Sequence, residues 1–277
     1  MPRLWPDRRV KPQYGTVEID WGHKLASGLD ACWLFNEGGG TILDLTKRGA
    51  DATLSGGLNW VTGQGGIGID SPHSDTVQAT FSTRGLPTST NTLTMMAIFT
   101  MRTLNPFNVL YETRSLVLQG LLLSSATGNP LTWAWNADGN DYGAATGLTL
   151  STGRVYLGVA AIAAGTTKMY LVDLSNLGTM STFNSGLSNT AQTMNGSWQF
   201  CVDSNGGSRG WDGHIYQAAM WERTLSDADV QTLAAEPYAF LREARRRRIF
   251  VVAGVPPADT VLDTKHRSTI WYGGLRG

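Results

Sequence analysis

The stretch from Gly210 to Leu233 constrains the fold most, because a long apolar strand pattern runs directly into a helix-start signal. Strict alternation gives this strand two faces, one with Ile215, Gln217, Ala219 and Trp221 and the other with Tyr216, Ala218, Met220 and Glu222. Both faces are largely apolar, so the pattern predicts an interior strand that other parts of the protein cover on each side.

The helix that should follow has its own start and stop signals. Ser226 is a favourable N-cap residue, and Asp229 can return a hydrogen bond to the cap amide, as in a capping box. Val230 and Leu233 give the helix a short buried side, and Pro237 marks its end. The stretch therefore predicts one strand followed at once by one short helix.

Composition excludes several classes of protein. The chain has 277 residues, enough for one large domain with extensions or for two small domains. Its formal net charge is zero and 16% of its residues are charged, which gives no general attraction for nucleic acid or an anionic membrane. No apolar run reaches the roughly 20 residues of a membrane span, and residues 1–9 lack the apolar region of a secretory signal.

Short strand patterns repeat from residue 29 to about residue 240, with turn signals between them. The longest early strand is predicted over residues 92–102, and residues 154–162 and 168–173 predict a hairpin. With roughly a dozen strands and one helix, the pattern predicts an all-β, two-sheet jelly-roll sandwich with extended terminal arms.

Changes of composition divide the sequence into three parts. Residues 1–27 contain three prolines and no sustained periodicity, so we expect an N-terminal arm outside the core. Residues 28–241 hold the jelly-roll domain. Residues 242–277 form a second arm that begins with an arginine run and keeps apolar and aromatic residues, unlike a typical disordered tail.

The arginine run has three interpretations: nucleic-acid binding, a merely solvated segment, or pairing with acidic groups of a partner. Neutral overall charge and the absence of interleaved aromatic residues argue against nucleic acid. A strand-like run and an aromatic tail follow directly, which favours a partner protein. The predicted partner-binding residues are Arg245, Arg246, Arg247, Arg248, Phe250, Trp271 and Tyr272.

Two distant segments carry a family resemblance. Residues 28–40, followed by Asp44, and the stretch that starts at Gly210 resemble the opening and closing motifs of laminin-G-like and concanavalin A-like domains. The resemblance implies that the two segments are the first and last core strands and that they pair. It implies a fold more than a function, because this fold carries lectins, adhesion modules, hydrolases and virion proteins.

A narrower resemblance lies at the two ends. Residues 14–21 with Leu25 and Gly28-Leu29 resemble the lead-in of laminin-G-like proteins encoded by tailed bacteriophages and prophages, and the arginine run resembles their C-terminal ends. The resemblance implies a non-enzymatic virion structural protein, in first place a capsid decoration protein that clamps the particle with its arms. The implied partners are the major capsid protein, other virion proteins and further copies of the chain, in a virion assembled in the host cytoplasm. The alternative is a tail- or fibre-associated carbohydrate-binding module for host-surface glycans.

A glycan hydrolase is the weakest function class. Such enzymes of this fold place three acids on one strand face as Glu-x-Asp-x-x-Glu, with separations that suit a retaining mechanism. The chain has only Glu18-Ile19-Asp20, followed by His23 where the third acid belongs. Zinc spacings and nucleophile motifs are missing from the sequence, and the glycine cluster at 63–68 predicts a turn rather than a phosphate loop. We therefore expect no catalytic residues and no cofactor.

Calcium is the one metal that the sequence suggests, because many relatives of this fold bind it in rim loops through oxygen ligands. Asp138 and Asp141 form the most oxygen-rich local group and are the candidate ligands. Tyr216 stands where the family often has an acid, which counts against a shared site. The alternative role for these aspartates is to cap loops as Asx turns.

Tryptophans suggest a sugar-binding platform. Trp133 and Trp135 share a face of a predicted strand, with Asn136 and Tyr142 nearby. These four residues are the candidate glycan-binding group, and the alternative is that both tryptophans fill the core.

The two cysteines, Cys32 and Cys201, lie in apolar strand-like segments. We expect two buried free thiols, and a disulfide between neighbouring strands is the alternative.

Overall fold

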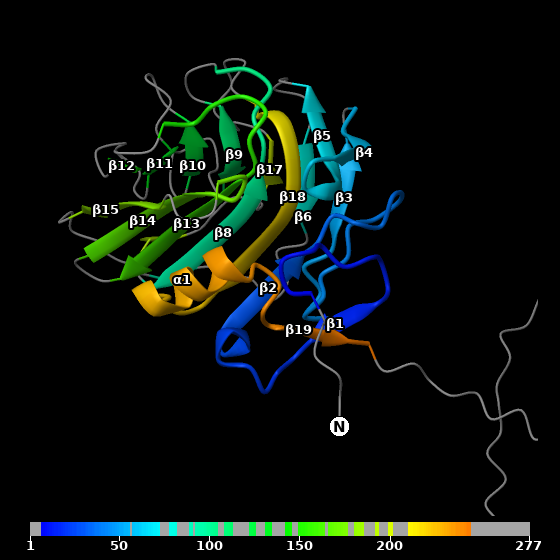
Figure 1. Ribbon diagram of the computed structural model, residues 1–277, viewed down its shortest axis with the longest axis horizontal. Coiled ribbons are helices and arrows are strands. Elements are labelled where there is room, and N and C mark those ends of the chain that lie inside the picture. The colour runs from blue at the N-terminus through cyan, green and yellow to red at the C-terminus, as the bar shows by residue number, and fades with distance from the viewer. Residues whose placement is uncertain are drawn as a thin grey trace, which may run out of the picture. The chain divides into compact units, whose positions relative to one another are not determined.

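The computed structural model describes residues 7–55, 57–72, 78–81, 89–90, 92–104, 108–112, 122–125, 131–134, 142–145, 149–163, 166–176, 180–185, 192–193, 199–201 and 210–244. The described part of the chain is an all-β sandwich of antiparallel strands with one short α-helix (Figure 1), as the strand pattern predicts. No helix in these ranges is long and apolar enough to cross a membrane.

The first sheet contains the longest strands and is built around β18. Its strand order is β15 (Met180–Ser185), β14 (Thr166–Asp173), β13 (Tyr156–Ala163), β8 (Leu93–Phe99), β18 (Asp212–Trp221), β5 (Gly66–Pro72) and β4 (Asn59–Gly63), and β2 (Leu29–Trp33) pairs with β18 as well. The β13–β14 pair is the predicted hairpin.

The second sheet is made of shorter strands. Its order is β12 (Tyr142–Ala145), β11 (Leu131–Ala134), β10 (Leu122–Ser125), β9 (Val109–Glu112), β17 (Gln199–Phe200), β6 (Gln78–Phe81) and β3 (Ala52–Ser55). Two small ladders pair β1 (Val17–Ile19) with β19 (Leu241–Glu243) and β7 (Ser89–Thr90) with β16 (Gln192–Thr193). The helical elements are the 3₁₀ turn η1 (Lys24–Ala26) and the helix α1 (Asp227–Ala235).

Both faces of the first sheet are covered, so there are two apolar clusters. The inner cluster joins the two sheets, for example through Phe99 of β8 and Phe200 of β17. The outer cluster packs the opposite face of the first sheet against α1 and the N-terminal segment, for example Tyr170 with Leu25 and Val230. This arrangement confirms that β18 is an interior strand with structure on each side.

The predicted alternation along β18 is wrong in its first half. Ile215 belongs to the inner cluster with Ala218 and Met220, whereas Tyr216 belongs to the outer cluster with Ala219. The reason is a register shift against β8 between Ile215 and Gln217, where an extra residue interrupts the two-residue period.

The opening and closing segments pair, as the family resemblance implies. Ala219 of β18 lies opposite Cys32 of β2 in an antiparallel ladder. Asp44 supports this strand from the following turn, because its carboxylate accepts hydrogen bonds from the amides of Cys32 and Thr46 and from the Thr46 hydroxyl. The acid of the opening motif is therefore a turn-capping residue.

The closing motif ties four parts of the chain together. Trp221 donates its indole N–H to the carbonyl of Leu25 over 2.6 Å. Arg223 donates to the carbonyls of Ser27 and Lys24 and pairs with Asp229 in the first turn of α1. Ser27 is followed by Gly28, whose φ of 71° and close approach to the Arg223 side chain suit glycine.

The start of α1 is the predicted one. The Ser226 hydroxyl accepts from the amide of Asp229, and the Asp229 carboxylate accepts from the amide of Ser226, which completes a capping box. The helix ends at Ala235, two residues before Pro237.

The expectation that residues 1–27 stand outside the core is wrong for the later part of that segment. Val17, Ile19, Leu25 and Ala26 are buried in the outer cluster. These residues are buried because Val17–Ile19 pair with β19, a strand more than 200 residues later in the chain. No local sequence pattern reveals such a distant partner.

Both cysteines are buried free thiols, as predicted. Cys32 belongs to the outer cluster and Cys201 to the inner cluster, so they lie in different apolar layers. Burial raises the pKa of Cys32 far above its ordinary value and that of Cys201 to about 12, so neither thiol is a ready nucleophile.

Candidate functional site

Most of the residues predicted to bind ligands or partners lie outside the described ranges. These residues are Trp135, Asn136, Asp138, Asp141, Arg245, Arg246, Arg247, Arg248, Phe250, Trp271 and Tyr272. For Trp133 and Tyr142 the structure gives the backbone alone: β11 pairs with β12, with Trp133 opposite Gly143 and Ala134 opposite Tyr142. The sugar platform, the calcium pair and the partner-binding arm therefore stay predictions.

A cleft of about 330 Å³ opens where β8 ends and β18 begins. We call it the His214 cleft. It is lined by Gly63, Gln64, Thr100, Met101, Arg102, Thr152, Gly153, Gly213, His214 and Tyr216. Three of these ten residues are glycines, and Gln64 and Thr152 each lie beside a glycine in a turn, so half of the lining comes from glycines and turn residues.

The backbone forms this cleft through an unusually close approach of two strands. Gly213 has a φ of 147°, and a Cβ at this position would overlap the carbonyl oxygen of Thr100. The carbonyl of His214, one residue further on, accepts from the amide of Thr100 over 2.9 Å. Only glycine permits this conformation and approach, so the start of β18 depends on it.

The predicted glycine turn packs against the side chain of Tyr216. Gly63 and Gly65 lie so close to the Tyr216 ring and hydroxyl that a Cβ at either position would overlap them. A Cβ at Gly68 would lie 2.6 Å from the carbonyl oxygen of Ile215. The cluster is therefore a turn, as predicted, but its composition is set by packing on β18.

Arg102 is the charged residue in the lining of the cleft, and two aspartates hold it. Its Nη1 lies 2.8 Å from Asp212, and its Nη2 is ion-paired with Asp70. Thr103 donates its hydroxyl to the other oxygen of Asp212 over 2.5 Å. The guanidinium is thereby fixed in one orientation, with 45% of the side chain exposed.

His214 links this charged group to Tyr216. Its Nδ1 shares a hydrogen bond of 3.1 Å with the Tyr216 hydroxyl, and its Nε2 lies 3.5 Å from Asp70. Burial lowers the pKa of His214 below its ordinary value of 6.5, although Asp70 acts in the opposite direction. The imidazole is therefore neutral at pH 7 and presents one donor and one acceptor.

Lys11 braces the same strand from the N-terminal segment. Its ammonium donates to the carbonyls of Phe35, Ile67 and Tyr216 and lies 5.7 Å from the centre of the Tyr216 ring. Burial lowers the pKa of Lys11 to about 7, partly offset by Glu37. A groove of about 540 Å³ lined by Lys11 shares Gly63 and Gln64 with the His214 cleft, so the two hollows adjoin at the glycine turn.

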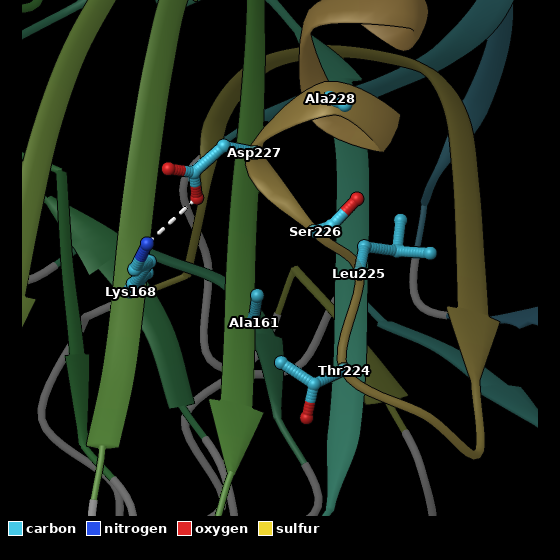
Figure 2. A pocket seen from close by; sticks show the side chains of 7 residues that line it. All are labelled: Ala161, Lys168, Thr224, Leu225, Ser226, Asp227 and Ala228. Atoms are coloured by element: carbon cyan, nitrogen blue, oxygen red, sulfur yellow. Dashed lines mark hydrogen bonds and ion pairs between the residues drawn. The ribbon is translucent and has the colours of Figure 1, made fainter.

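A further cavity of about 460 Å³ lies at the start of α1 (Figure 2). Its polar side chains already serve the fold: Asp227 pairs with Lys168 over 2.7 Å and accepts from the Tyr170 hydroxyl, and these bonds lower the pKa of Asp227. The Ser226 hydroxyl caps the helix. This cavity is therefore the weaker candidate for a ligand site.

The described residues contain no group of three or more His, Cys, Asp or Glu side chains placed to hold a metal ion. Asp70 and Asp212, two of the acids that a calcium site in this fold could draw on, bind Arg102 instead. Calcium at Asp138 and Asp141 lies outside the described residues and stays untested.

Sequence reasoning missed the His214 cleft because its lining comes from four separate segments. The available signal was local: His214 and Tyr216 are two residues apart on a strand whose second residue is a glycine, facing a glycine-rich turn. The sequence does not mark Arg102 as a site residue, because it follows a strand, β8, whose residues are all buried.

Comparison with known proteins supports the fold and leaves the family open. No protein-family model matches the chain, and no curated protein matches its sequence. Among solved structures, domain 4 of AbnA, an extracellular arabinanase from Geobacillus stearothermophilus solved in complex with arabinotriose, aligns with a TM-score of 0.57 at 16% identity. The alignment covers 74% of this chain and 98% of that domain.

Two further structures share the fold over part of a longer chain. The binding domain of botulinum neurotoxin serotype G aligns with a TM-score of 0.56 at 10% identity, over 75% of this chain and 50% of that one. Trypanosoma rangeli sialidase in complex with the inhibitor DANA aligns with a TM-score of 0.54 at 14% identity, over 74% of this chain and 32% of that one. At these identities the likeness shows the fold, a β-sandwich domain, and no activity.

Proposed function

We propose that the chain is a non-catalytic glycan-binding module that holds its ligand in the His214 cleft. The observation that carries this proposal is the preorganised polar lining: a guanidinium fixed by two carboxylates, a neutral imidazole fixed by Tyr216, and exposed Gln64 and Thr152, each beside a glycine. Sugars offer donors and acceptors together, and rigid groups of both kinds bind them at low entropic cost. The arabinotriose complex of the AbnA domain is a precedent for sugar binding by a domain of this fold.

The absence of catalysis is part of the proposal. A retaining glycosidase needs two carboxyl groups free to act as acid and nucleophile on opposite sides of the scissile bond. The two carboxylates beside the His214 cleft, Asp70 and Asp212, both bind Arg102. They serve to orient the guanidinium, so we expect binding without turnover.

A virion role is the second candidate, and it is compatible with sugar binding. It is favoured by the resemblance of residues 14–29 and of the arginine run to proteins of tailed bacteriophages and prophages. In this version the module is a capsid decoration protein or a tail-fibre component, and residues 245–277 attach it to the major capsid protein, other virion proteins or further copies of itself. Deletion of residues 245–277 should then abolish attachment to particles and leave sugar binding intact.

The test of the glycan-binding proposal is a broad glycan array followed by calorimetry on the strongest ligand. Gln64→Ala and Thr152→Ala remove exposed cleft groups without touching the core, so each should weaken binding about five- to fiftyfold, as expected for one or two lost hydrogen bonds. Lys168→Ala, at the other cavity, is the matched control and should bind normally. Binding that is unaffected by both cleft variants would move the site elsewhere, and binding to no glycan on the array would end the proposal.

A further inference from the structure

The charged and polar groups in and beside the His214 cleft indicate what charge its ligand can have. Among its ten lining residues, Arg102 is the single charged side chain, because the imidazole of His214 is neutral at pH 7. An acidic sugar would therefore depend on Arg102 for its carboxylate.

Arg102 already uses three of its five N–H groups within the protein. Its Nη1 donates to Asp212 and also lies 3.5 Å from the carbonyl of Ser71, while its Nη2 donates to Asp70. A bidentate arginine–carboxylate contact needs two parallel N–H groups on one edge of the guanidinium. Here the edge between the two terminal nitrogens serves two aspartates, so a ligand carboxylate would meet Nε–H and the second N–H of Nη2 beside the Asp70 carboxylate.

The local charge balance points the same way. Two carboxylates face one guanidinium, so the group carries one excess negative charge. Asp70 is 28% exposed and its carboxylate lies 3.5 Å from Nε2 of His214, directly behind two of the residues that line the cleft, His214 and Arg102. Two basic residues beside the cleft are engaged as well: Arg154, next to Gly153, pairs with the buried Asp173, and Lys11, which lines the adjoining groove, donates to three carbonyls.

We propose that the His214 cleft selects uncharged oligosaccharides and rejects those that carry carboxylates. This inference rests on the proposed function and adds the class of ligand to it. Asp70 is the specificity-determining residue, since it both occupies Arg102 and supplies the repulsive charge. Rejection by a built-in unfavourable contact is a common route to specificity, and it leaves the contacts with neutral sugars unchanged.

The experiment uses matched pairs of saccharides that differ only at C6, a hydroxymethyl group in one and a carboxylate in the other, namely the trimers of galactose and galacturonate and those of glucose and glucuronate. The full-length protein should bind the neutral member of a recognised pair at least about tenfold more tightly at low salt, and the ratio should shrink in 0.5 M salt as the repulsion is screened. Asp70→Asn also loosens Arg102, so both affinities can change, but the ratio of neutral to acidic affinity at low salt should fall by at least about threefold. Asp227→Asn makes the same charge change at the other cavity and should alter neither affinity.

Each outcome decides the inference. Equal or tighter binding of the acidic members by the native protein would overturn it and leave the glycan-binding function standing. A salt-independent preference would also overturn it, since the discrimination would then be steric, and this measurement needs no variant. Binding to neither member of any pair, nor to any array glycan, would overturn the inference and the proposed function together.

Discussion

The ammonium of Lys11 donates a hydrogen bond of 2.5 Å to the main-chain carbonyl of Tyr216, across more than 200 residues of sequence. The contact falls at the register shift of β18, between Ile215 and Gln217. It ties the N-terminal segment to the strand that forms the floor of the His214 cleft. The segment expected to be an arm is thus a brace for the candidate site.

Replacing Lys11 should therefore weaken the fold. Lys11→Met keeps the aliphatic stem but leaves three carbonyls without their donor, which should lower the free energy of unfolding by about 1–3 kcal/mol. Urea denaturation measures this directly. Lys47→Met, at an exposed position, is the control and should change stability by less than about 0.5 kcal/mol. Equal stability of both variants would mean that the brace contributes nothing.

The glycine turn should not tolerate a methyl group at the position beneath Tyr216. Gly65→Ala places a Cβ 2.4 Å from Cδ2 of the Tyr216 ring and should destabilise the protein by about 1–3 kcal/mol through overpacking. Gly39→Ala is the matched control, because a Cβ there has no heavy atom within 4 Å. Thermal melts of the two variants make the comparison, and an unchanged melting temperature for Gly65→Ala would contradict the packing described for the turn.

Thr94 should be the most sensitive hydroxyl of the closing motif. It is fully buried, donates to the carbonyl of Arg223 over 2.7 Å and accepts from the amide of Leu225 over 2.9 Å. Thr94→Val keeps the shape and leaves both groups unsatisfied, so we expect a loss of about 2–4 kcal/mol. Thr53→Val, at an exposed position of β3, should be close to neutral, and chemical denaturation of the pair decides the point.

Stability should depend on pH through His214. Burial lowers its pKa in the folded state below 6.5, so between that lowered value and 6.5 the unfolded chain binds more protons than the folded one. The stability that His214 contributes is thus present above pH 6.5 and is lost as the pH falls through this window. His214→Gln should remove that part of the pH dependence, so its cost in urea should be larger at pH 7.5 than at pH 5. A cost that grows on acidification would mean that the folded protein favours the imidazolium.

Structural features that depend on residues close together in the chain were predictable from the sequence. The capping box of Ser226 and Asp229 and the β13–β14 hairpin are two examples. The pairing of β2 with β18 was predictable for another reason, because a family resemblance supplied the long-range contact.

The parts that escaped prediction depend on tertiary contacts. Strict alternation could not reveal the bulge at Tyr216, which is set by pairing with β8. The burial of Val17 and Ile19 depends on β19, a three-residue strand with no pattern of its own. Arg102 became a candidate site residue only because Asp70 and Asp212 come from two other strands.

The central claim is that a sugar binds in the His214 cleft, and nuclear magnetic resonance of the labelled protein tests it most directly. Titration with the best neutral oligosaccharide should shift the backbone amides of Gln64, Arg102, Gly153 and His214 together, with one dissociation constant. Saturable shifts confined to residues 131–145, around Trp133 and Tyr142, would contradict the account and restore the tryptophan platform as the binding site.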